Sequence, residues 1–99
     1  GIGHALFEEV IYQDGQILNA DPFQYRLPVM PEIPESFHSS MLENRDGPGP
    51  FGSKGMSQTS IVTVAPAIGN AIYDAVGVRI RSLPITPEKV LKALGKLGK

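Results

Sequence analysis

The stretch Gly49-Pro-Phe-Gly-Ser-Lys-Gly-Met-Ser-Gln58 lies near the middle of the chain and separates a turn-rich first half from a more helical second half. It belongs to a longer segment, residues 44–60, which holds four glycines and two prolines. Segments of this length without helical or strand periodicity are usually functional loops or disordered. We therefore expect a long glycine-rich loop here, and we take it as the first candidate site.

A helix is predicted soon after this loop. Apolar side chains recur every four residues from Val64 to Val76, which places them on one face of a helix. Gly77 suits the C-terminal cap, because glycine adopts the left-handed conformation without steric cost. Pro66 is expected in the first turn, where its missing N–H group is not needed.

The N-terminal segment also shows helical spacing. Apolar residues at four-residue intervals from Ile2 to Val10 predict a helix over residues 2–13. Asp14-Gly15 then predicts a turn. Ile17-Leu18 are predicted to begin a short strand after this turn.

The remaining segments alternate between extended chain and short elements. Three prolines within residues 28–34 fix φ and lack an N–H group, so this segment is predicted to be extended. Residues 36–43 and residues 78–81 are predicted to be short strands. A last helix is predicted from Thr86-Pro87-Glu88, with threonine as N-cap and proline in the first position, to about Leu94.

This order of elements predicts the α+β class: three helices with short strands and a long glycine-rich loop. We expect residues 1–99 to form a single segment of a larger domain, because the chain opens in mid-pattern at Gly1-Ile2-Gly3 without an initiator methionine. The lack of cysteine excludes disulfides and Cys-ligated metals within the chain, and it suits a cytoplasmic protein. A net charge of -1 argues against nucleic acid as a partner, and no apolar run is long enough to span a membrane.

The polar residues do not match a phosphate-binding loop or a histidine metal site. Gly47 and Gly52 have the spacing of a phosphate-binding loop, but Ser53-Lys54 reverses the required Lys-Ser/Thr order. Prolines at positions 48 and 50 also remove two N–H donors from such a loop. His4 and His38 are far apart and lack accompanying carboxylates at ligand spacing, so no metal ligands are assigned.

The central loop resembles the "GP-aromatic-G-x-K-G-x-G-E" loop of the molybdopterin-dependent hydroxylases, the xanthine dehydrogenase/aldehyde oxidase family. Four further segments resemble motifs of that family, in the same order along the chain. They are Gly1–Val10 ("GIG-x-AL-x-EE"), Asp14–Asn19 ("DG-x-(L/I)-LN"), Ala65–Ala75 ("PAIANAI-x-DA") and Gly77–Glu88 ("G(V/I)R" with "LP-(I/L)-TPE"). Nearly the whole chain is covered by this resemblance.

The resemblance implies that the chain is the C-terminal segment of a molybdenum-binding subunit that hydroxylates aldehydes, purines or other N-heterocycles. It implies a molybdenum–molybdopterin cofactor in the full subunit, with [2Fe–2S] clusters and FAD on partner chains or domains. Gly55, Met56, Ser57 and Gln58 would then line the cofactor. The chain alone would not be active.

One position departs from the family pattern. The loop of the family ends in a glutamate thought to deprotonate the metal-bound hydroxyl, whereas this chain has Gln58, preceded by Ser57 instead of glycine. An amide hydrogen-bonds but does not act as a base at neutral pH. Gln58 could still orient a substrate, with the base supplied elsewhere. The alternatives are a non-catalytic interaction piece of the same fold and an unrelated small α+β binding module.

Overall fold

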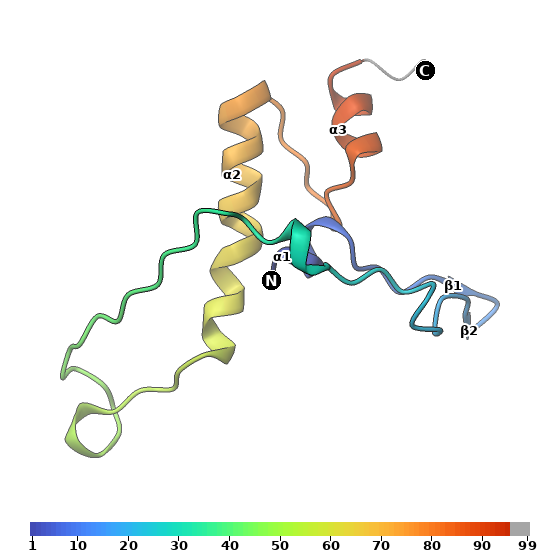
Figure 1. The fold of residues 1–99 in the computed structure, drawn as a ribbon. Helices are drawn as coiled ribbons and strands as arrows, with labels where there is room; N and C mark the ends of the chain where they lie inside the picture. The colour runs from blue at the N-terminus through green and yellow to red at the C-terminus, as the bar shows by residue number, and fades with distance from the viewer. Residues whose placement is uncertain (96–99) are drawn as a thin grey trace.

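The computed structural model describes residues 1–95 of the chain. Within this range it contains three α-helices and one two-stranded antiparallel hairpin, which confirms the α+β class (Figure 1). Three short 3-10 helices (η1–η3) interrupt the irregular segments. The elements are α1 (Ile2–Leu6), β1 (Tyr12–Gln13), β2 (Gln16–Ile17), η1 (Met30–Glu32), η2 (Pro50–Gly52), η3 (Gln58–Thr63), α2 (Val64–Val76) and α3 (Pro87–Ala93).

The best-buried part of the chain lies where α1 meets α2 and the segment before α3. Ala5 is fully buried, and the Ile85 N–H group donates a hydrogen bond of 2.6 Å to the Ala5 carbonyl oxygen. Gly1 lies so close to α2 that a Cβ atom there would approach the Val64 Cγ2 atom to 2.7 Å. Gly3 is equally confined, since a Cβ atom there would lie 2.8 Å from Pro28 Cδ. Small residues on α1 therefore allow this close packing.

The first helix is shorter than the sequence predicts. The prediction of a helix over residues 2–13 is wrong beyond Leu6, because the Asn19 side chain hydrogen-bonds to the backbone of the residues that follow α1 and holds them outside the helix. Its Oδ1 atom accepts a hydrogen bond of 2.9 Å from the Ile11 N–H group, and its Nδ2 atom donates one of 2.6 Å to the Glu9 carbonyl oxygen. Asn19 is 9% exposed, so these bonds are largely shielded from water.

The predicted turn at Asp14-Gly15 is confirmed. Both residues have positive φ, 50° and 76°, which is the backbone geometry that a two-residue hairpin loop requires. Tyr12 pairs with Ile17 across this turn. The strand predicted to begin at Ile17 therefore exists, but β2 occupies Gln16–Ile17.

The two other predicted strands are absent. Residues 36–43 and 78–81 have no strand structure, because neither segment has a neighbouring strand with which to pair. The alternating pattern of the second segment instead reflects packing onto α2. The Arg79 guanidinium lies 4.1 Å from the centre of the Tyr73 ring and donates a hydrogen bond of 2.7 Å to Asn70 Oδ1.

The two later helices agree with their predictions. Gly77 ends α2 with a φ of 75°, and its N–H group donates to the Tyr73 carbonyl oxygen at 2.8 Å. Pro66 is the third residue of α2, within the first turn. Thr86 caps α3 by accepting a weak 3.4 Å hydrogen bond from the Lys89 N–H group. The predicted long loop ends three residues early, since η3 begins at Gln58 and runs directly into α2.

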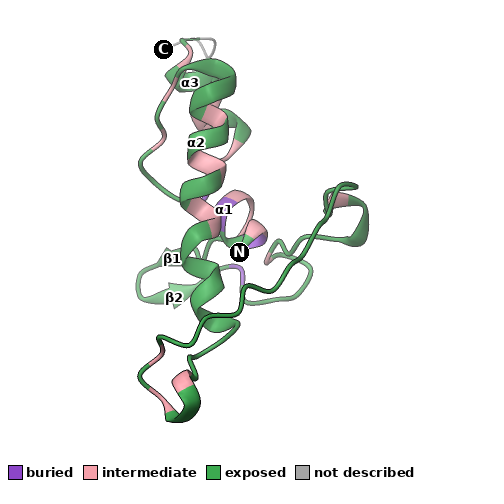
Figure 2. Ribbon diagram, turned by 90° about the vertical axis from the view of Figure 1, so that its left-hand side faces the viewer, coloured by how far each residue is buried: buried purple, intermediate pink, exposed green. Residues whose placement is uncertain are grey.

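The chain is open in shape and leaves many large apolar side chains in contact with solvent (Figure 2). Its radius of gyration is 17.6 Å, whereas a compact domain of this length has about 13 Å. Phe23, Leu42 and Phe51 are each at least 95% exposed. Within residues 1–95, no helix is long and apolar enough to cross a membrane.

Asn19→Ala is expected to loosen residues 9–19, because the two partly buried hydrogen bonds between the Asn19 side chain and the backbone of Glu9 and Ile11 are lost. The expected cost in local stability is about 1–3 kcal/mol. Hydrogen exchange measured by mass spectrometry on the intact protein checks this. Gln24→Ala, at an exposed position, is the control and is expected to leave exchange of these peptides unchanged.

Candidate functional site

The central loop contains a closed turn at residues 44–54. The Gly49 N–H group donates to the Ser53 carbonyl oxygen at 3.1 Å, and the Gly52 N–H group donates to the Gly49 carbonyl oxygen at 3.0 Å. The Lys54 ammonium donates to the Asn44 side-chain oxygen. Gly52 has a φ of 79°, and a Cβ atom there would collide with the Arg45 carbonyl oxygen. Glycine is therefore required at this position for the turn to close.

The four residues assigned to the site from the sequence, Gly55 to Gln58, follow this closed turn. Gly55, Met56 and Ser57 are exposed, and Gln58 is the first residue of η3. Within residues 1–95, the backbone N–H groups of residues 55–57 donate no hydrogen bond. Three donors are therefore available to a bound group beside the start of a helical segment.

Ser57 turns the chain into η3 with a backbone conformation that suits glycine. Its φ and ψ are 81° and −60°. These values correspond to the γ-turn with positive φ, which is rare and strained for residues with a side chain. Glycine adopts this conformation at the lowest cost, whereas this chain has a serine here.

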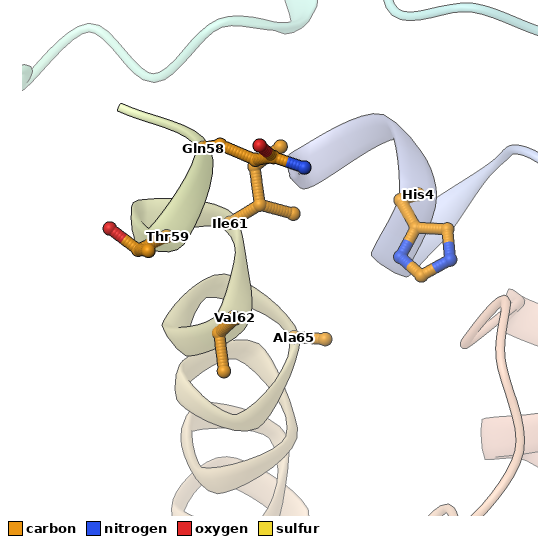
Figure 3. Close-up of a pocket in the computed structure, with 6 residues that line it drawn as sticks. All are labelled: His4, Gln58, Thr59, Ile61, Val62 and Ala65. Atoms are coloured by element: carbon orange, nitrogen blue, oxygen red, sulfur yellow. The ribbon is translucent and has the colours of Figure 1, made fainter. Parts of the chain in front are cut away.

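Gln58 borders an open hollow of about 470 Å³ between η3, α2 and α1. Figure 3 shows its side chain extending from the start of η3 toward α1, where His4 lies. The remaining lining residues are mostly apolar. The full lining is His4, Gln58, Thr59, Ile61, Val62 and Ala65.

The structure thus does not gather the four predicted site residues in one place, and Ser57 lines neither of the two depressions beside it. Only Gln58 lines the hollow with His4, whereas Gly55 and Met56 line a different depression with the closed turn. The place of His4 beside Gln58 was not predicted from the sequence, where His4 was weighed only as a metal ligand. No spacing rule connects two residues this far apart, because their proximity results from the packing of α1 on α2. Within residues 1–95, no cluster of three or more His, Asp or Glu side chains could hold a metal ion.

Among residues 1–95, two ionisable groups have shifted pKa values, and both lie outside the hollow. The hydrogen bond from the Tyr25 hydroxyl to Glu8 Oε1, 3.0 Å long, raises the pKa of Tyr25. The Arg26 guanidinium, which hydrogen-bonds to Glu32, lowers the pKa of Glu32, as does the Val29 N–H group. These interactions stabilise the segment between β2 and η1 and have no part in the site.

Comparison with known proteins gives matches along nearly the whole chain. The chain is 41% identical over 97 residues to a probable hypoxanthine oxidase of Escherichia coli, a match that covers 97% of this chain. It is 38% identical over 100 residues to a putative xanthine dehydrogenase molybdenum-binding subunit of the same organism, covering 99% of this chain. It is 35% identical over 96 residues, 95% of this chain, to the molybdenum-binding subunit of an Escherichia coli aldehyde oxidoreductase.

The chain belongs to the xanthine dehydrogenase/aldehyde oxidase family. The family resemblance of the central loop and its flanking motifs is thereby confirmed, and an unrelated binding module is ruled out. The chain spans only 10–13% of the length of these three relatives, so it corresponds to one segment of a molybdenum-binding subunit. No protein-family model matches the chain.

Ser57→Gly is expected to stabilise the loop by about 1 kcal/mol. The substitution removes about 1–3 kcal/mol of backbone strain, while the greater freedom of glycine in the unfolded chain offsets about 0.5–1 kcal/mol. Denaturant unfolding of the intact protein, or protection of residues 54–60 from hydrogen exchange, measures the effect. Ser53→Gly is the matched control, because Ser53 has an ordinary extended conformation (φ −67°, ψ 150°). It is expected to destabilise the same loop, so equal effects of the two substitutions would contradict the strain argument.

Proposed function

We propose that this chain is the C-terminal segment of a molybdenum-binding hydroxylase subunit and forms one wall of its active site. The proposed reaction is the oxidative hydroxylation of an aldehyde or an N-heterocycle. The observation that carries the proposal is the placement of Gln58: the residue at the family's glutamate position borders a hollow at the start of η3. The matches to molybdenum-binding subunits support it.

The residues of the loop fit a molybdopterin group on one side. A pterin carries many polar atoms and needs hydrogen-bond donors from the protein. The N–H groups of Gly55, Met56 and Ser57 are available as such donors, and a Cβ atom at Gly55 would have no atom within 4 Å. The bound cofactor would supply the two-electron oxidation. Iron–sulfur clusters and FAD on partner chains or domains would carry the electrons away.

Gln58 would act in this site as an orienting group. Its amide can donate one hydrogen bond and accept another, which holds a bound oxygen or nitrogen in place. It has no carboxylate to accept a proton, so it does not perform general-base catalysis. This single difference also supports a second candidate function, a non-catalytic subunit of the same fold that binds the cofactor without turnover.

We also propose that the subunit works in the cytoplasm. A chain without cysteine forms no disulfide of its own and does not depend on an oxidising compartment. The rest of the molybdenum-binding subunit would cover the apolar side chains that this segment exposes.

Gln58→Glu in the intact, cofactor-loaded complex is expected to raise the rate of hydroxylation. General-base catalysis contributes roughly 10²- to 10⁴-fold, so the gain is large where Gln58 is the only defect. Turnover of hypoxanthine and of an aromatic aldehyde measures it. Gln24→Glu makes the same change at an exposed position outside the hollow and is expected to have no effect.

The double variant Ser57→Gly, Gln58→Glu tests whether the backbone strain at Ser57 limits the gain from a carboxylate at position 58. Its hydroxylation rate is expected to exceed that of Gln58→Glu alone, because a strained serine no longer precedes the new carboxylate. A fully active wild-type complex that loses rate on Gln58→Glu would contradict the proposed role of Gln58. A complex that holds molybdopterin but turns over nothing before or after the change would support the non-catalytic alternative.

The isolated chain is expected to bind neither molybdenum nor pterin. A large cofactor requires protein on several sides, whereas the loop of this chain is exposed on an open structure. Metal analysis and pterin fluorescence of the purified 99-residue chain check this. The intact subunit is the control and is expected to hold about one cofactor per chain, while stoichiometric cofactor on the isolated chain would overturn the expectation.

A further inference from the structure

The hollow bordered by Gln58 has one ionisable side chain, His4 on α1. The other polar groups of its lining are the Gln58 amide and the Thr59 hydroxyl, neither of which takes up a proton at neutral pH. The rest of the lining is hydrocarbon, from two η3 residues and Ala65 of α2 (Figure 3). Within residues 1–95, the imidazole of His4 makes no hydrogen bond, so both of its nitrogens are available to a ligand.

Backbone packing fixes the place of this histidine. The residue on its C-terminal side, Ala5, is fully buried, and its carbonyl oxygen accepts the hydrogen bond from Ile85. Three residues before His4, Gly1 lies against Val64 at the start of α2, one turn beyond the η3 residues of the hollow. Because α1 is attached at both points, the His4 side chain is held on the Gln58 side of α2.

We propose that His4 is the proton-accepting side chain of the site, in the role that Gln58 cannot fill. This inference rests on the proposed function. A neutral imidazole nitrogen would take a proton from an O–H or N–H group of the molecule held at Gln58. The bonding electron pair would stay on the oxygen or nitrogen, and the imidazolium would later release the proton to water. Histidine is the side chain that ordinarily changes charge between pH 5 and 8.

Among residues 1–95, no other charged group lines the hollow with His4. On α2, the ionisable residues are near the opposite end of the helix, and the arginines before α3 line a separate depression with Ala65 and Asn70. The Glu8 carboxylate, after α1, lies against Gly3 and accepts a hydrogen bond from the Tyr25 hydroxyl group. These groups are Tyr73, Asp74, Arg79, Arg81 and Glu8.

The first test measures access to the imidazole by carbethoxylation with diethyl pyrocarbonate, followed by mass spectrometry of the intact subunit with and without its cofactor. His4 is expected to react roughly 3- to 10-fold more slowly in the loaded subunit, since a bound molecule in such a site is 70–90% covered. His38, on an exposed extended segment, is the internal control and is expected to react equally in both forms. Equal reactivity of His4 in the two forms overturns the proposal.

The second test compares His4→Gln with His38→Gln in the loaded complex over pH 5–9, with hypoxanthine, whose ring N–H groups can lose a proton, as the substrate. His4→Gln keeps hydrogen bonding but has no group that accepts a proton, so it is expected to lower the rate by roughly 10²-fold and to change the shape of the pH–rate profile. His38→Gln is expected to keep both the rate and the profile. An unchanged profile in His4→Gln, or a loaded wild-type complex without turnover, overturns the proposal.

Hydrogen exchange of residues 55–58 in the same samples distinguishes this inference from the proposed function. If the cofactor protects these residues from exchange but does not slow the carbethoxylation of His4, then His4 has no role in the site, while the proposed function is retained. No protection of residues 55–58 would overturn both.

Discussion

The contact between α1 and α2 is the constraint on which the rest of this structure depends. Gly1 can approach Val64 closely only because it lacks a side chain, and Ala5 is small enough to be fully buried beside Ile85. This contact brings the first residues of the chain against a helix that begins more than fifty residues later. It also fixes the segment before α3 through the hydrogen bond to Ala5. Larger residues at these positions would separate α1 from η3 and open the hollow that Gln58 borders.

The strained turn at Ser57 joins two parts of different character. Before it, residues 44–54 close on themselves through backbone hydrogen bonds, and residues 55–57 keep their N–H groups unpaired within the described chain. After it, η3 and α2 form one continuous helical segment from Gln58 to Val76. The reversal at Ser57 therefore sets the direction of the Gln58 side chain.

Local signals in the sequence predicted the elements that local interactions determine. The turn at Asp14-Gly15, the cap at Gly77 and the start of α3 each depend on a few adjacent residues, and all three are confirmed. The end of α1 could not be predicted in this way, because it depends on hydrogen bonds from Asn19 to residues eight and ten positions earlier. The two absent strands show the same limit, since alternation of side chains does not reveal whether a partner strand exists. The proximity of His4 and Gln58 is likewise a long-range result.

The exposed apolar side chains have a consequence for how stability is distributed. Phe23, Leu42 and Phe51 contribute almost no burial within this segment, so their replacement by polar residues costs the segment itself very little. In the proposed subunit the rest of the protein covers these side chains. The same replacements would there weaken the packing of this segment against the rest of the subunit. Thermodynamic linkage then makes the folded state of the segment depend on the presence of that surface. In that proposed subunit its cooperative unit of unfolding would extend beyond its own residues.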